Sequence, residues 1–455
     1  MTENYFELSD IFATVIWFVI IALSGQMYYL NKKHIPHYKY YMWNLYAKLF
    51  GAFFFALIYT YYYDGGDTTA YWKGGVKLHE LFLKDPSAYF DEMWRVASKK
   101  TIGANNFQNF EDRPPNWIYG EAQGYFVCKI ASIFSMLCFK SYFAGSLIMG
   151  AITAFCSWRF FEYVLKKGVN DKKFIAFTTL FIPSTIFWCS GISKDSLILN
   201  SIFLVLINLN IAKDKKNKLA SRLWLILSLF IIFKIRSFIL VATLAPLYLA
   251  INSQLTKKLK DTPLYLGLFR TFSITALIAF AGLYFGTSVF GEFSINSLLE
   301  EMKIIHSDFT GNLLYTGRRY DIGPIDYSNI GLLNSFPSAL VAAVFRPFIW
   351  EVFSDGSNPF MLLNGLESLL IFYMIFKFIR GKNMKGRLKT IFTSDLLLFS
   401  LFFVLIIGFF VGYTSVLFGV LVRLKSPLLP FVVLIFSATA TTKKELTNQL
   451  EPTVL

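Results

Sequence analysis

Apolar runs of roughly 15 to 22 residues alternate along this chain with short clusters of Lys and Arg. A hydrocarbon layer about 30 Å thick requires about 20 consecutive apolar residues in a helix. The composition agrees, because 55% of the residues are hydrophobic and only 16% are charged, against about 25% charged in soluble domains. We therefore expect residues 1–455 to form a single integral membrane domain of the all-α, polytopic class.

The apolar runs predict about eleven spanning helices. They are expected at 11–30, 44–63, 142–163, 174–190, 195–212, 222–233, 237–252, 268–290, 362–380, 392–412 and 426–441. Two further apolar stretches, 123–139 and 331–350, are short or interrupted by charge. These two could be interfacial or re-entrant helices.

The net charge of +15 comes largely from basic clusters at the ends of apolar runs. This placement is typical of topology determinants, which gather on the cytoplasmic side, so we do not expect nucleic-acid binding. All the short basic segments can share that side only if 123–139 does not cross the membrane. The sequence then predicts an N-terminus outside and a C-terminus in the cytoplasm.

This topology leaves two long outer loops, at 64–141 and 291–361. The first carries nine basic and nine acidic residues, and the second carries four basic and eight acidic residues. Most of the polar side chains that could carry chemistry lie in these loops. Arg423 and Lys425 are expected to precede the last helix at the same outer surface.

The segment Tyr61–Trp72 follows the second predicted helix and holds two carboxylates three residues apart, Asp64 and Asp67, around a Gly-Gly pair. Tyr and Trp mark the membrane interface, so the carboxylates would lie where a lipid headgroup lies. One could act as a general base on a hydroxyl, or the pair could hold a divalent cation. The alternative is a turn at a helix end with solvated carboxylates.

Two basic segments belong to short turns between predicted helices. Lys194 and Asp195 join two helices and are expected to face the same outer cavity as Asp64 and Asp67, with Asp195 as a substrate-binding residue. The alternative is that Asp195 simply caps a helix N-terminus. Lys234 and Arg236 split one apolar run and must reach the membrane surface or a polar cavity, because a charge at mid-bilayer costs about 2.5–3.5 kcal/mol. An Arg fork and a Lys are the expected receptors for a phosphate, and snorkelling to lipid headgroups is the alternative.

The second outer loop offers further candidates for substrate binding. They are Arg318 and Arg319, then Arg346, Trp350 and Glu351 in the segment Phe345–Glu351, and Arg423 before the last helix. Aromatic faces beside charged hydrogen-bonding groups suit sugar binding and equally suit anchoring at the interface. The outer histidines, His79 and His306, lack metal-ligand spacing, and we expect no metal beyond a divalent cation at Asp64 and Asp67.

This order of motifs over about residues 44–252 resembles the GT-C superfamily of membrane glycosyltransferases. The resemblance rests on the acidic first loop with Asp64 and Asp67, the turn with Asp195, and the helix pair broken at Lys234 and Arg236. It implies a GT-C-like helical fold with juxtamembrane helices in the outer loops, in a bacterial inner membrane. It also implies transfer of a sugar from a polyprenyl-phosphate carrier to a glycan, lipid or protein acceptor.

The resemblance also implies roles for these residues. Asp64 or Asp67 would be the catalytic base, and Lys234 and Arg236 would hold the carrier phosphate. From its place at the same outer face, we add Lys194 as a further candidate for the carrier phosphate. The chain departs from the family pattern by an extra N-terminal helix and by lacking a large C-terminal soluble domain.

Two other functions stay open from the sequence. The second half, with Arg346 to Glu351 and Arg423, is similar to bacterial membrane proteins of surface-polysaccharide synthesis, so an O-antigen or capsule polymerase is an alternative. The third reading is a non-enzymatic membrane subunit or transporter.

Overall fold

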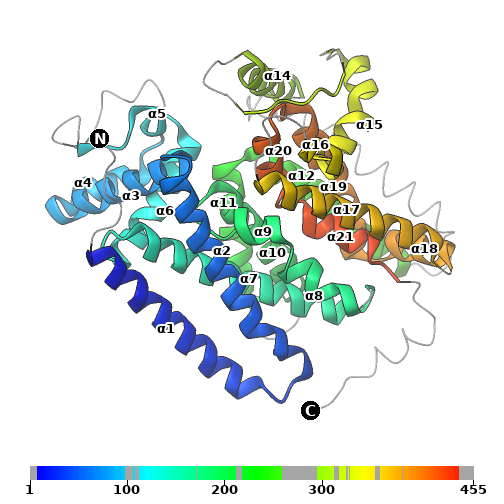
Figure 1. The fold of residues 1–455 in the computed structure, drawn as a ribbon, viewed down its shortest axis with the longest axis horizontal. Coiled ribbons are helices and arrows are strands. Elements are labelled where there is room, and N and C mark those ends of the chain that lie inside the picture. The colour runs from blue at the N-terminus through cyan, green and yellow to red at the C-terminus, as the bar shows by residue number, and fades with distance from the viewer. Residues whose placement is uncertain are drawn as a thin grey trace. The chain divides into compact units, whose positions relative to one another are not determined.

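The computed structural model describes residues 8–97, 106–107, 112–170, 172–211, 218–258, 295–311, 317–323, 326, 328–353, 359–381 and 383–439. The regular structure of these ranges is helical (Figure 1). The described residues also form two isolated β-bridges. The prediction of an all-α fold is therefore confirmed.

The chain divides into two compact units, which we call unit 1 and unit 2. Unit 1 comprises residues 1–162 and 179–237, and unit 2 comprises residues 163–178 and 238–455. Each is described by itself.

Unit 1 is built from the N-terminal helices and from the helices that follow residue 179. Their bounds are α1 (Leu8–Lys32), the 3-10 helix η1 (Pro36–Tyr40), α2 (Tyr41–Tyr61), α3 (Asp67–Lys84), α4 (Pro86–Trp94), α5 (Asn116–Tyr119), α6 (Ala122–Leu137), α7 (Tyr142–Lys167, whose last residues belong to unit 2), α9 (Pro183–Trp188), α10 (Lys194–Ile211) and α11 (Lys218–Ile235). Helices α1 and α2 pack side by side as a hairpin (Figure 1).

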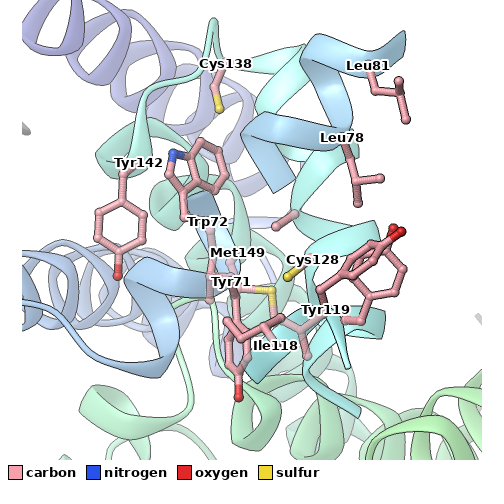
Figure 2. Close-up of a cluster of buried hydrophobic side chains, with 14 of the residues drawn as sticks. Tyr71, Trp72, Leu78, Leu81, Ile118, Tyr119, Cys128, Cys138, Tyr142 and Met149 are labelled. Carbon is pink, nitrogen blue, oxygen red and sulfur yellow. The ribbon is translucent and has the colours of Figure 1, made fainter. Parts of the chain in front are cut away.

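The core of unit 1 lies between α3 and α6, which pack closely because α3 presents two glycines to its neighbour. A Cβ on Gly75 would lie 2.8 Å from the Cβ of Ala131, and one on Gly74 would lie 2.6 Å from the Cys128 sulfur. Only glycine permits this approach of two helices. Figure 2 shows the surrounding core, in which the ring of Trp72 of α3 lies beside that of Tyr142 of α7, with centroids 5.9 Å apart.

Unit 2 contains most of the second half of the chain. Its helices are α8 (Lys172–Leu180, whose last residues belong to unit 1), α12 (Ser237–Lys258), α14 (Ile295–Gly311), α15 (Asn329–Phe345), α16 (Ile349–Val352), α17 (Pro359–Arg380), α18 (Met384–Thr393), α19 (Asp395–Thr414), α20 (Phe418–Lys425) and α21 (Leu429–Phe436). Helix α19 is central, since it packs against α14, α15, α18, α20 and α21.

Among the described residues, five helices are long and apolar enough to cross a membrane. They are 8–32, 36–61, 142–167, 361–380 and 395–414, and the bent pair α20 and α21 would make a sixth. These match predicted runs at 11–30, 44–63, 142–163, 362–380 and 392–412. A membrane protein is thus indicated, while the count of about eleven crossings stays a prediction, and the run at 268–290 lies outside the described residues.

Several predicted runs are divided in the structure. The run 174–190 breaks between α8 and α9, where Pro183 takes the first position of α9. The break at Lys234–Arg236 is present, because α11 ends at Ile235 and α12 begins at Ser237.

Arg423 and Lys425 do precede α21, the last described helix, as predicted. They lie inside a further helix, α20, which meets α21 at a bend of 64°. Lys425 is also fully buried, so it is not a surface residue of unit 2.

The stretch 123–139 forms α6, a helix of 16 residues. At 1.5 Å per residue it is about 24 Å long, which is short of the hydrocarbon thickness. Its length is consistent with the interpretation of a helix that does not cross.

Candidate functional site

In unit 1, the turn between α2 and α3 positions the two predicted carboxylates differently. Gly65 and Gly66 have φ of 114° and 132°, and Asp64 before them has φ of 50°. Glycine adopts such values without strain, and the Gly65 amide donates to the Tyr59 carbonyl at 2.8 Å. Asp64 is consequently exposed on the turn, whereas Asp67 is partly buried as the first residue of α3.

Lys194 is the first residue of α10 and forms an ion pair with Glu121. Its Nζ lies 2.7 Å from Glu121 Oε1, and it lies over the Tyr71 ring at 5.8 Å. Asp67 and Glu121 attract this ammonium electrostatically, and Arg236 repels it. Three segments that are distant in sequence therefore meet at Lys194.

Asp195, the next residue, pairs with Arg236 from the break between α11 and α12. The distance from Arg236 Nη1 to Asp195 Oδ1 is 2.9 Å, and the Asp195 side chain is fully buried. Removing one partner of such a pair leaves an uncompensated buried charge. We call Asp67, Glu121, Lys194, Asp195 and Arg236 the unit 1 cluster.

Lys234 lies two residues before Arg236 and differs from it in its partners. Its ammonium lies over the Phe230 and Phe233 rings of its own helix, at 5.6 and 5.9 Å. Within the described ranges, no carboxylate lies within ion-pair distance of Lys234. A basic group without a carboxylate nearby is the better receptor for an external anion.

Lys129 of α6 adds a second basic group near Lys234. The ring of Phe126, one turn before Lys129, meets the ring of Phe230, one turn before Lys234, at 5.9 Å. Lys129 is buried and donates to the carbonyls of Met93 and Arg95 at 2.9 and 2.8 Å. Burial, with repulsion from Arg95 and Lys234, lowers the pKa of Lys129 to about 8.

A buried polar network around Glu92 was not predicted from the sequence. The Glu92 side chain is fully buried, and its carboxylate accepts hydrogen bonds from Arg95 Nε at 2.7 Å, the Tyr125 hydroxyl at 2.5 Å, the Tyr119 hydroxyl at 2.9 Å and Asn106 Nδ2 at 3.2 Å. Burial and Glu92 raise the pKa of both tyrosines. The available signal was the i, i+3 spacing of Glu92, in the last turn of α4, and Arg95, which follows the helix.

Lys48 of α2 was also missed. It is 1% exposed, within a helix long and apolar enough to span a membrane. Ionisable residues in such positions are functional candidates by default, and the apolar run that contains Lys48 gave no sign of its burial.

In unit 2, four residues form what we call the unit 2 cluster: Arg318, Arg346, Glu351 and Lys425. Arg346 Nε lies 3.6 Å from Glu351 Oε1. Lys425 Nζ donates to the Arg346 carbonyl at 2.6 Å, and Arg318 donates to the Glu351 carbonyl. The other carboxylate oxygen of Glu351 accepts from the Phe348 amide at 2.7 Å.

The remaining candidates of unit 2 lie around this cluster in different environments. Trp350 is 66% exposed and stacks on Phe348, with ring centroids 4.6 Å apart. Arg319 is exposed and makes a β-bridge with Leu417. Arg423 is partly buried in α20.

The predicted site residues thus fall into two groups. Asp67, Lys194, Asp195 and Arg236 are brought together in unit 1, and Arg318, Arg346 and Glu351 in unit 2. In the part of the chain that is described, no three His, Cys, Asp or Glu side chains group as metal ligands. A divalent cation at Asp64 and Asp67 would therefore need backbone or water ligands as well.

Chemically, the unit 1 cluster combines the partly exposed carboxylate of Asp67 with two cations, Lys194 and Arg236, each of which is paired with a further carboxylate. Such a group can accept a proton from a hydroxyl and can balance negative charge that develops on a leaving group. In comparisons with family models, curated proteins and solved structures, nothing matches this chain.

Proposed function

We propose that this chain is a membrane glycosyltransferase. It transfers a sugar from a polyprenyl-phosphate carrier to a glycan, lipid or protein acceptor. The observation that carries the proposal is the ion pair of Lys194 with Glu121 at 2.7 Å, next to the ion pair of Asp195 with Arg236 at 2.9 Å. Asp67 of α3 also attracts Lys194 electrostatically. We place the chain in a bacterial inner membrane, with the N-terminus and this cluster outside.

In the proposed reaction Asp67 is the general base. An acceptor hydroxyl gives its proton to the Asp67 carboxylate, and its oxygen forms a bond to the anomeric carbon of the donor sugar. The bond from that carbon to the carrier phosphate breaks, and the electron pair leaves with the phosphate. Asp64 is the weaker candidate, because its side chain is exposed on the turn.

We assign the carrier phosphate to Lys234 as its main receptor, because of the carboxylates that lie beside the other two cations. Lys194 and Arg236 each lie within 3 Å of a carboxylate, at 2.7 and 2.9 Å. Those carboxylates offset much of the attraction that the two cations would exert on a phosphate. The attraction of Lys234 for a phosphate is not offset in this way. Arg236, two residues further on, adds a guanidinium group that can donate two parallel hydrogen bonds to the phosphate.

The test compares Asp67→Asn with Asp64→Asn as its matched control. Purified protein in nanodiscs is given a lipid extract that contains polyprenyl-phosphate sugars, together with acceptor glycan, and product is measured by mass spectrometry. We expect Asp67→Asn to reduce transfer by at least 100-fold, the order expected for loss of a general base. We expect Asp64→Asn to retain most of it.

If Asp67→Asn is fully active at normal protein level, Asp67 is not the general base. Wild-type protein that transfers no sugar from any lipid-linked donor in the extract would contradict the glycosyltransferase proposal itself.

A polysaccharide polymerase is the second candidate, and the unit 2 cluster favours it. Arg318 and Arg346 converge on Glu351 next to the exposed Trp350. If this cluster binds the growing glycan, Arg346→Ala shortens the glycan chains made by cells, whereas Asp67→Asn leaves their length distribution unchanged. The glycosyltransferase proposal expects instead that Asp67→Asn impairs glycan synthesis more severely than Arg346→Ala does.

A further inference from the structure

Helix α18 of unit 2 joins two helices that are long and apolar enough to cross a membrane, α17 and α19. Three residues separate α18 from the end of α17, and one residue, Ser394, separates it from the start of α19. Links of this length reach at most about 14 Å. Two crossing helices end at a membrane surface, so a segment that is tethered to both of them lies at that surface.

One face of α18 is held against the rest of unit 2. Arg387 Nη1 donates to the carbonyls of Lys377 and Phe378 in the last turn of α17, at 3.3 and 3.0 Å. Thr390 and Ile391 are buried, and the helix packs against α17 and α19. The orientation of α18 about its own axis is therefore fixed.

The opposite face of α18 is exposed and carries two parallel strips. Met384, Leu388 and Phe392 are spaced four residues apart and are 40%, 37% and 37% exposed, so they form an apolar strip. Lys385 and Lys389 are exposed as well and form a basic strip, about 100° further round the helix. Neither lysine forms an ion pair with a residue that the structure describes.

The charge of this region indicates what covers the exposed face. From residue 368 to residue 394 the chain carries six basic residues and no acidic residue. Arg380, at the end of α17, is also exposed. An apolar strip that borders lysines is typical of helices that lie in a membrane interface, where the apolar side chains enter the acyl boundary and the cations meet lipid phosphates. The tethers at both ends place α18 at such an interface.

We propose that α18 is an interfacial helix that binds the headgroups of anionic phospholipids. Lys385 and Lys389, together with Arg380, contact the lipid phosphates, and the apolar strip inserts among the acyl chains. A zwitterionic phospholipid carries its own cation beside the phosphate, so α18 prefers lipids with a net negative charge. This inference requires only that the chain lies in a membrane, and it is independent of the proposed glycosyl transfer.

The test measures lipid preference at α18 itself. A fluorophore attached to the full chain at Leu388→Cys reports from the apolar strip, because the four native cysteines are buried and should not react. Phosphatidylcholine nanodiscs receive spin-labelled phosphatidylglycerol or spin-labelled phosphatidylcholine at the same mole fraction, and quenching by the two lipids is compared. We expect phosphatidylglycerol to be preferred at least about fivefold, the contribution of one lysine near an anionic surface.

Variants of the basic strip separate its contribution from that of the other basic residues. Lys385→Gln combined with Lys389→Gln should lose most of the preference, and the corresponding pair of Lys→Arg variants should keep it. The matched control combines Lys33→Gln with Lys39→Gln, which removes the same charge from two exposed lysines of unit 1. This control should leave the lipid preference at α18 unchanged.

Three results would overturn the proposal. The first is a fluorophore that neither lipid quenches, because α18 would then not contact acyl chains. The second is equal quenching by the two lipids when both lysines are present. The third is a control variant that lowers the preference as much as the α18 variant does. Asp67→Asn should lose glycosyl transfer and keep the lipid preference, so failure of one proposal can be told from failure of the other.

Discussion

The Glu92 network provides a direct test of how unit 1 is held together. The perturbation is Arg95→Met, alone and with Glu92→Gln. The Glu92 carboxylate has no solvent exposure and accepts four hydrogen bonds, and Arg95 is the one charged donor among them. It also lies over the Tyr119 ring at 3.8 Å.

The magnitude follows from what each variant leaves behind. Breaking a buried ion pair costs about 3–5 kcal/mol, and the three donors that remain on Glu92 reduce this, so we expect Arg95→Met to destabilise by about 2–4 kcal/mol. Glu92→Gln leaves Arg95 without its carboxylate and should cost about as much. The double variant removes both charges, so it should cost less than the sum, with a coupling of about 1–3 kcal/mol.

The assay is thermal unfolding in nanodiscs, followed by tryptophan fluorescence. One kcal/mol shifts the midpoint of a domain of this size by about 2–4 °C, so each single variant should unfold roughly 4–16 °C earlier. Lys84→Met is the control, because its pair with Asp112 is 3.9 Å long and partly exposed and should contribute little. Additive single effects within about 0.5 kcal/mol would refute the coupled network.

Two further predictions concern α3 and α6. Gly75→Ala should lower the unfolding midpoint, since its Cβ would lie 2.8 Å from the Ala131 carbonyl carbon and overpacking costs about 1–3 kcal/mol; Gly419→Ala, with open space around the Cβ, should not lower it. Lys129 has a pKa lowered to about 8 from 10.5, so between these values the unfolded chain holds the extra proton. The stability that Lys129 contributes therefore rises with pH across this window. At pH 7 Lys129→Met should unfold at a higher temperature than the wild type, and this difference in unfolding midpoint should become smaller by pH 10. A difference that stays constant with pH would contradict the burial of the charge.

The spanning helices were the predictable part of the fold. Runs such as 11–30 and 142–163 are long, apolar and bounded by charge, so their helices follow from the thickness of a bilayer. Runs shortened by proline were harder. The segment 174–190 reads as one helix by hydropathy, and Pro183 starts a second helix in its middle.

The site was predictable only in part, for a physical reason. The charges at Lys194 and Arg236 attract notice because they interrupt apolar runs. Their partners do not, because Glu121 lies 73 residues from Lys194 and is an ordinary acidic residue at the start of α6. Likewise, Tyr119 and Tyr125 meet Glu92 across about 30 residues. Such pairs depend on tertiary packing, which no local pattern encodes.

The central claim is that Lys234 and Arg236 hold the phosphate of a polyprenyl carrier. A cryo-EM structure of the full chain in nanodiscs with polyprenyl phosphate tests it most directly. The account predicts phosphate density within hydrogen-bond distance of Lys234 and Arg236, on the side of unit 1 where Asp67 lies. Phosphate held by Arg346 or Arg318 of unit 2, with none at Lys234, would contradict it.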